Sequence, residues 1–128
     1  MNAIETVYSG CRFRSRLEAR YAVFLDFLGV VWEYEPQGYK FGPKGREELY
    51  LPDFWLPGLA LWLEIKPSLS DEAEAKTVAR AERLCELLAE ESGIPVALAC
   101  GVPDVVTPVR PAGSDAATYH GITPGSLK

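Results

Sequence analysis

The sequence predicts a three-layer α/β domain in which helices pack beside a mixed β-sheet. Two segments have the apolar spacing of amphipathic helices, and four shorter segments are rich in apolar residues and flanked by turn signals. Their order is helix, three strands, helix, strand. The 128 residues suffice for one such domain, which we place at residues 1–102. Residues 103–128 are rich in Pro, Gly, Ser and Thr and predict an extended or flexible tail.

The first helix is expected at residues 15–29. Ser15 is a suitable N-cap, and Gly29 is a natural end. One face of this helix is apolar and consists of Leu17, Tyr21, Phe24, Leu25 and Leu28. Since such a face must be buried, the helix is expected to pack against the sheet.

Three strands are expected next, at residues 31–41, 49–56 and 59–66. Aromatic residues that favour β-structure are frequent in the first of them. The second and third predict a hairpin whose two-residue turn is Pro57 and Gly58.

The second helix is expected to begin at a Ser68 or Ser70 cap and to end before Gly93. Its buried face would consist of Val78, Ala81, Cys85 and Leu88. Residues 95–100 predict the last strand, because small and β-branched residues dominate them.

Composition and charge indicate a cytoplasmic protein. No apolar run approaches the roughly 20 residues that a membrane-spanning helix needs, and the first residues lack the pattern of a secretory signal. The three cysteines form no C-x-x-C pair, which favours reduced thiols. The net charge is −5, with a balance of +2 through Arg46 and −7 after it. This distribution disfavours a non-specific nucleic-acid coat protein but allows a local basic face.

Charged residues in the most apolar part of the chain predict a catalytic site. Glu64 and Lys66 share one face of the third strand with Trp62, and the leucines and Ile65 between them form the opposite face, expected to be the core side. With a two-residue turn, Asp53 would oppose Trp62 and lie diagonal to Glu64, about 7–8 Å away. The two carboxylates could then share a Mg²⁺ ion, while Lys66 reaches the attacking water or a phosphate oxygen. The alternative is a set of solvated surface charges.

Glu18 allows two interpretations. It lies three residues after Ser15, so it fits a capping box in which its carboxylate bonds back to the cap. It also lies about 20° from Leu25 around the helix at 100° per residue, which could direct it towards the acids. We favour a metal-binding or water-positioning role.

Other charged groups are weaker candidates. Arg12, Arg14 and Arg16 could bind phosphate or form an exposed basic face. One of Glu33 and Glu35 could approach the site, although exposed positions are favoured. On the second helix a sector with Lys76, Arg80 and Arg83 also contains acids and predicts a salt-bridged surface.

These residues resemble a known family. Pro52 and Asp53, followed by Glu64, Ile65 and Lys66, resemble the motif of the PD-(D/E)XK nuclease superfamily. The element order resembles the restriction-endonuclease-like core of that superfamily. The segments 13–20, 32–36 and 50–54 are similar to small phage-encoded and transposon-type endonucleases, and the resemblance spans roughly residues 12–100.

The resemblance implies a Mg²⁺-dependent endodeoxyribonuclease in which Mn²⁺ can substitute. Position by position, it assigns Asp53, Glu64, the backbone carbonyl of Ile65 and the helix acid Glu18 to the metal, and Lys66 to water activation. The location would be the host-cell cytoplasm if the chain is phage-encoded.

The resemblance also bears on the substrate and on the alternative function. One active site cuts one strand, so a double-strand break would need a homodimer or a partner subunit. Too few basic residues are present for long phosphate tracking, which favours structure-selective or weakly sequence-specific nicking. The alternative is a non-cleaving module that binds nucleic acid or protein on a nuclease fold.

Overall fold

The computed structural model describes residues 5–66, 72–103, 108–111 and 120–121, and these form a mixed α/β fold. The elements are β1 (Thr6–Tyr8), β2 (Cys11–Phe13), α1 (Arg16–Phe27), β3 (Glu33–Tyr34), β4 (Tyr39–Phe41), β5 (Glu48–Tyr50), β6 (Phe54–Leu56), β7 (Leu61–Lys66), α2 (Glu72–Ser92), β8 (Val96–Cys100), β9 (Pro108–Pro111) and β10 (His120–Gly121). Neither described helix is long and apolar enough to cross a membrane.

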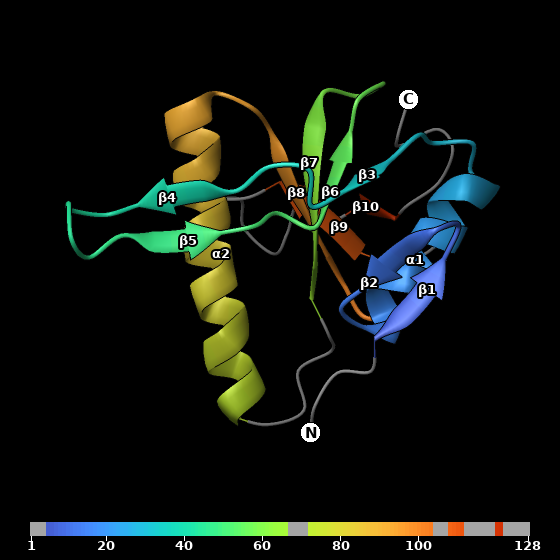
Figure 1. Ribbon diagram of the computed structural model, residues 1–128, viewed down its shortest axis with the longest axis horizontal. Helices are drawn as coiled ribbons and strands as arrows, with labels where there is room; N and C mark the ends of the chain where they lie inside the picture. The colour runs from blue at the N-terminus through green and yellow to red at the C-terminus, as the bar shows by residue number, and fades with distance from the viewer. Residues whose placement is uncertain (1–4, 67–71, 104–107, 112–119, 122–128) are drawn as a thin grey trace.

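Among the described residues, six strands form the central sheet in the order β10-β9-β8-β7-β6-β3. The β7–β8 pair is parallel and the other pairs are antiparallel, so the sheet is mixed as predicted. In Figure 1 the sheet is seen nearly edge-on, with α2 on one side and α1 on the other. The β1–β2 hairpin lies beside α1, and the β4–β5 hairpin extends across α2.

The α1 helix confirms the predicted cap and end. The Ser15 hydroxyl accepts a hydrogen bond from the backbone N–H of Glu18 at 3.2 Å. Gly29 adopts φ of 74°, a left-handed conformation in which glycine is unstrained. Tyr21 and Leu25 from the predicted face are fully buried, together with Ala19 and Ala22, while Leu17, Phe24 and Leu28 are partly buried.

Both faces of the sheet are covered, which corrects the expectation of a single core side. Leu63 and Ile65 of β7 pack with Phe54 and Leu56 against α1. Trp62, on the opposite face of β7, is 3% exposed and packs with Val96 and Leu98 against Leu84, Cys85 and Leu88 of α2. Strands with helices on both faces carry nearly continuous apolar runs, and the sequence Leu-Trp-Leu-Glu-Ile of β7 fits this pattern.

Two predicted strands are interrupted. The prediction of one strand at 31–41 is wrong, because β3 pairs with β6 whereas β4 pairs with β5 in a separate hairpin. The chain turns at Glu35, whose φ is 44°, and at Pro36, which has no N–H to donate. The strand predicted at 49–56 is also divided, into β5 and β6 around Pro52.

The predicted two-residue turn between β6 and β7 is wrong as well. Leu56 pairs with Leu61, so four residues form the turn. The Leu59 N–H donates to the Leu56 carbonyl at 3.1 Å, and Ala60 takes a left-handed φ of 51°. As a result Trp55, not Asp53, lies opposite Trp62.

The second helix agrees with its prediction where the structure describes it. Ala81, Cys85 and Leu88 are buried, and Gly93 follows the last turn with φ of 71°. The proposed caps Ser68 and Ser70 and the Val78 side chain lie outside the described residues. The β1–β2 hairpin and the strands β9 and β10, which come from the segment 103–128, were not predicted.

Candidate active site

Asp53 and Glu64 meet across the β6–β7 hairpin. The observed register pairs Phe54 with Leu63, so the next positions along the two chains are those of the acids. Each carboxylate accepts a hydrogen bond from the backbone of the other strand segment. The Asp53 N–H donates to Glu64 Oε1 at 3.1 Å, and the Ile65 N–H donates to Asp53 Oδ2 at 2.7 Å. The acids therefore lie closer together than the predicted diagonal arrangement. Both are buried, with 9% exposure for Asp53 and 2% for Glu64.

Lys66 joins this pair, as predicted. Its ammonium Nζ lies 2.9 Å from Glu64 Oε2, and its side chain is 18% exposed. Burial acts to lower the Lys66 pKa, but the carboxylates of Glu64 and Asp53 outweigh it and raise the pKa overall. The lysine is therefore a charged hydrogen-bond donor beside two acids.

Burial raises the pKa of Asp53 well above its usual value, and repulsion from the neighbouring Glu64 raises it further. Two carboxylates and one ammonium leave an excess of negative charge inside the protein. Such a group requires a shared proton or an additional cation, because an uncompensated buried charge is strongly unfavourable.

Glu18 makes the predicted contacts with its cap residue, whereas its metal-binding or water-positioning role stays a prediction. Its carboxylate accepts hydrogen bonds from the Ser15 hydroxyl at 3.1 Å and from the Tyr34 hydroxyl, so it belongs to the cap of α1. It also acts electrostatically on Asp53, whose pKa it helps to raise. The helix acid is thus close to the Asp53 and Glu64 pair but is held by its own partners.

Glu35 lies nearer to the site than the sequence suggested. Its backbone N–H donates to the Asp53 carbonyl at 2.9 Å, and its side chain is 16% exposed. Burial raises the pKa of Glu35. The positive charge of Arg14 lowers this pKa, while the negative charges of Glu18 and Glu64 raise it further. The signal that could have found it is Pro36, which has no N–H for a strand ladder and therefore marks the end of the strand before it.

The predicted basic groups separate in the structure. Arg14 pairs with Glu35, with Nε 3.2 Å from Oε2, whereas Arg12 pairs with Glu5 at 3.7 Å. Arg16 is the first residue of α1. On α2, Arg80 and Arg83 each lie 3.0 Å from a Glu48 oxygen, so that surface is salt-bridged as predicted, with a partner on β5.

A buried hydroxyl–thiol contact lies near the acids on the α2 side of the sheet. The Tyr50 hydroxyl and the Cys85 sulfur are 3.1 Å apart. Burial and the Glu64 charge raise the Cys85 pKa to about 12. This thiol is therefore protonated at neutral pH and is not a nucleophile.

The side chains around Asp53 suit a hard cation. All of the candidate donors are oxygens, which Mg²⁺ prefers, and Mg²⁺ keeps several of its waters when one or two carboxylates bind it. Among the described residues, no three Asp, Glu, His or Cys side chains are gathered closely enough to hold a metal ion. Two carboxylates such as Asp53 and Glu64 could hold a Mg²⁺ or Mn²⁺ ion that keeps most of its waters.

Comparison with protein-family models, curated proteins and solved structures finds no significant match to this chain.

We expect Asp53→Asn to stabilise the metal-free protein. The amide keeps an oxygen for the Ile65 N–H, offers a donor to Glu64 and removes one of two adjacent buried charges. Relief of such site strain is worth about 1 kcal/mol, or roughly 4 °C in Tm for a chain of this size. Thermal unfolding in EDTA measures the change, with Glu47→Gln as the matched control, since Glu47 is exposed and the amide keeps an oxygen for the Gly45 N–H. A fall in Tm for Asp53→Asn would show that the charge itself stabilises the fold.

Proposed function

We propose that this protein is a metal-dependent endonuclease that hydrolyses DNA phosphodiester bonds, with a restriction-endonuclease-like core. The observation that carries this proposal is the buried Asp53 and Glu64 pair with the Lys66 ammonium bonded to it. Two oxygen ligands and one cationic donor at the end of a hairpin are the groups that phosphodiester hydrolysis needs.

A purely structural role explains this pair less well. The two hydrogen bonds that join the acids to the backbone need only neutral acceptors, which Asn and Gln would supply without mutual repulsion. Burying two carboxylates side by side is unfavourable unless a cation or a proton compensates their charge. Strained or electrostatically unfavourable groups of this kind cluster at functional sites.

The division of roles follows from the contacts. Asp53 and Glu64 would hold Mg²⁺ or Mn²⁺, with the Ile65 carbonyl as a further ligand. When bound, the ion supplies a Lewis acid for the phosphate and a water of lowered pKa. Lys66 is charged, so it donates a hydrogen bond that orients the attacking water or stabilises the developing negative charge on the phosphate. Glu18, held by Tyr34 and Ser15, would position water at the edge of the site.

Of the predicted arginines, Arg14 is best placed to contact the DNA backbone, because it pairs with Glu35, whose backbone N–H bonds to the Asp53 carbonyl. We expect Arg14→Ala to weaken DNA binding about 5- to 10-fold and to reduce the salt dependence by about one phosphate contact. Lys44→Ala, in the exposed β4–β5 turn, is the matched control and should change neither. Binding measured in EDTA at several salt concentrations tests this. Equal effects of the two substitutions would remove Arg14 from the site.

The alternative is a module that binds nucleic acid or protein without cleaving. Calorimetric titration with Mn²⁺ separates the two functions. The proposed enzyme binds Mn²⁺, and Asp53→Asn or Glu64→Gln abolishes this binding while the fold is retained. A protein whose Mn²⁺ binding is absent, or is unchanged in both variants, is not this enzyme.

A further inference from the structure

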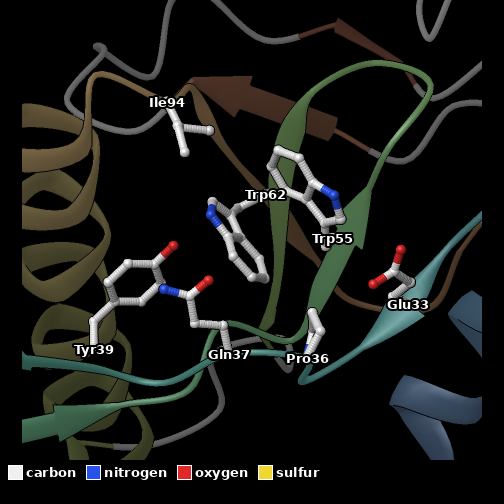
Figure 2. Close-up of a pocket in the computed structure, with 7 residues that line it drawn as sticks. All are labelled: Glu33, Pro36, Gln37, Tyr39, Trp55, Trp62 and Ile94. Carbon is white, nitrogen blue, oxygen red and sulfur yellow. The ribbon is translucent and has the colours of Figure 1, made fainter.

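A pocket of about 300 Å³ lies on the same face of the β6–β7 hairpin as the acids. Figure 2 shows Trp62 at its centre, between Trp55 on one side and Tyr39 on the other. The ring centroids are 5.0 Å apart for Trp55 and Trp62 and 5.9 Å apart for Tyr39 and Trp62. Its volume is at the lower end of the range of about 300–1,000 Å³ for small-ligand sites, so it suits one flat group of modest size.

One buried polar group that belongs to this pocket lacks a hydrogen-bond partner. Among the described residues, none accepts a hydrogen bond from the indole Nε1 of Trp62, although the side chain is 3% exposed. A buried donor without a partner is unfavourable by about 1–3 kcal/mol. The exposed Gln37 and Glu33 also line the pocket. A ligand that satisfies the indole must bring a hydrogen-bond acceptor.

The position of the pocket links it to the acids. Because side chains alternate along a strand, the Trp55 and Trp62 pair follows the Asp53 and Glu64 pair on the same face, about 6–7 Å along the hairpin. That spacing is comparable to the reach from a nucleotide's phosphate to its base. A DNA strand with its phosphate at the acids can therefore place a base at the tryptophans.

We propose that this pocket binds one unstacked nucleobase of the DNA strand whose phosphate lies at Asp53 and Glu64. This inference rests on the proposed function and specifies its substrate as DNA with an unpaired base near the cleavage position. Indole and phenol rings stack on a base, and base edges carry the acceptors and donors that match the Trp62 N–H, the Gln37 amide and the Glu33 carboxylate. A quaternary ammonium group would also suit an aromatic pocket, but it has no acceptor for the indole.

Binding of a short single-stranded oligonucleotide to the full chain in EDTA tests the pocket, with the same strand lacking its bases as the second probe. Trp55→Ala should weaken binding of the normal strand about 5- to 100-fold, as expected for loss of base stacking, and leave the abasic strand unaffected. Trp55→Phe should restore most of the affinity. Trp62→Phe, which removes only the N–H and some ring area, should weaken binding about 2- to 10-fold. Trp32→Phe, in the core on the opposite face of the sheet, is the matched control.

Thermal unfolding of each variant confirms that it is folded at the assay temperature. Equal binding of normal and abasic strands by the wild type, or an unchanged affinity of Trp55→Ala for the normal strand, overturns the base pocket. If the wild type still cleaves DNA in that case, the proposed function stands without it. If base-dependent binding requires Trp55 but no metal-dependent cleavage occurs, the pocket stands and the endonuclease proposal fails.

Discussion

Glu64→Gln is expected to reduce metal-dependent DNA cleavage at least about 100- to 1,000-fold, the loss seen when one preorganised electrostatic group is removed from an active site. Glutamine keeps the size of the side chain and an oxygen for the Asp53 N–H, but it loses the charge that pairs with Lys66 and would bind the metal. Lys66→Ala should cause a loss of the same order, because the donor to the phosphate or water disappears.

The control for this experiment is Glu47→Gln, an exposed acid in the β4–β5 turn, which should cleave like the wild type. Nicking of supercoiled plasmid measured over time gives the rates. Thermal unfolding should show that Glu64→Gln remains folded, so that the lost activity reflects chemistry. Cleavage by Glu64→Gln within a few-fold of the wild-type rate would remove this residue from the mechanism.

Phe54→Ala is expected to destabilise the fold by about 3–5 kcal/mol, a large part of the roughly 5–15 kcal/mol that stabilises a typical protein. Phe54 is fully buried, and its ring lies 6.1 Å from that of Phe13, 5.8 Å from Trp32 and 5.5 Å from Tyr34. Truncation leaves a cavity among rigid rings. Because Phe54 follows Asp53 directly, the substitution should also loosen the acid pair.

Urea unfolding measures this change as a lower midpoint with an unchanged slope. The matched control is Phe27→Ala, since Phe27 on α1 is 78% exposed and its loss should alter stability by no more than about 0.5 kcal/mol. A loss below about 1 kcal/mol for Phe54→Ala would mean that this aromatic cluster is not the core on the α1 side.

Local signals predicted the helices and the identity of the acids. The cap at Ser15 and the end at Gly29 depend on neighbouring residues only, so sequence reasoning found them. The hairpin signal was sufficient to predict that Asp53 and Glu64 lie on neighbouring strands, but it did not predict the register between these strands. Pro57 and Gly58 suggested a shorter turn than the one that forms, in which Ala60, rather than a glycine, takes the left-handed conformation.

Features that depend on distant segments were harder to predict. One of Glu33 and Glu35 was expected to be able to approach the site, but exposed positions were favoured for both, because the approach of Glu35 depends on the pairing of β3 with β6, which no local pattern specifies. The β1–β2 hairpin, by contrast, had a readable signal: Ser9 and Gly10 form its two-residue turn, both with positive φ. A residue pair of this kind between short β-favouring segments is typical of a tight hairpin.

Incubation of the purified chain with supercoiled, linear, forked and four-way DNA, in Mg²⁺, Mn²⁺ or EDTA, tests the central claim most directly. We predict nicking of at least one of these substrates with either metal and none in EDTA. We further predict a preference for substrates with unpaired bases and the same loss in Glu64→Gln and Lys66→Ala. Absence of cleavage on every substrate with both metals, or cleavage that persists in EDTA, would contradict the assignment of Asp53, Glu64 and Lys66 as a metal-dependent nuclease site.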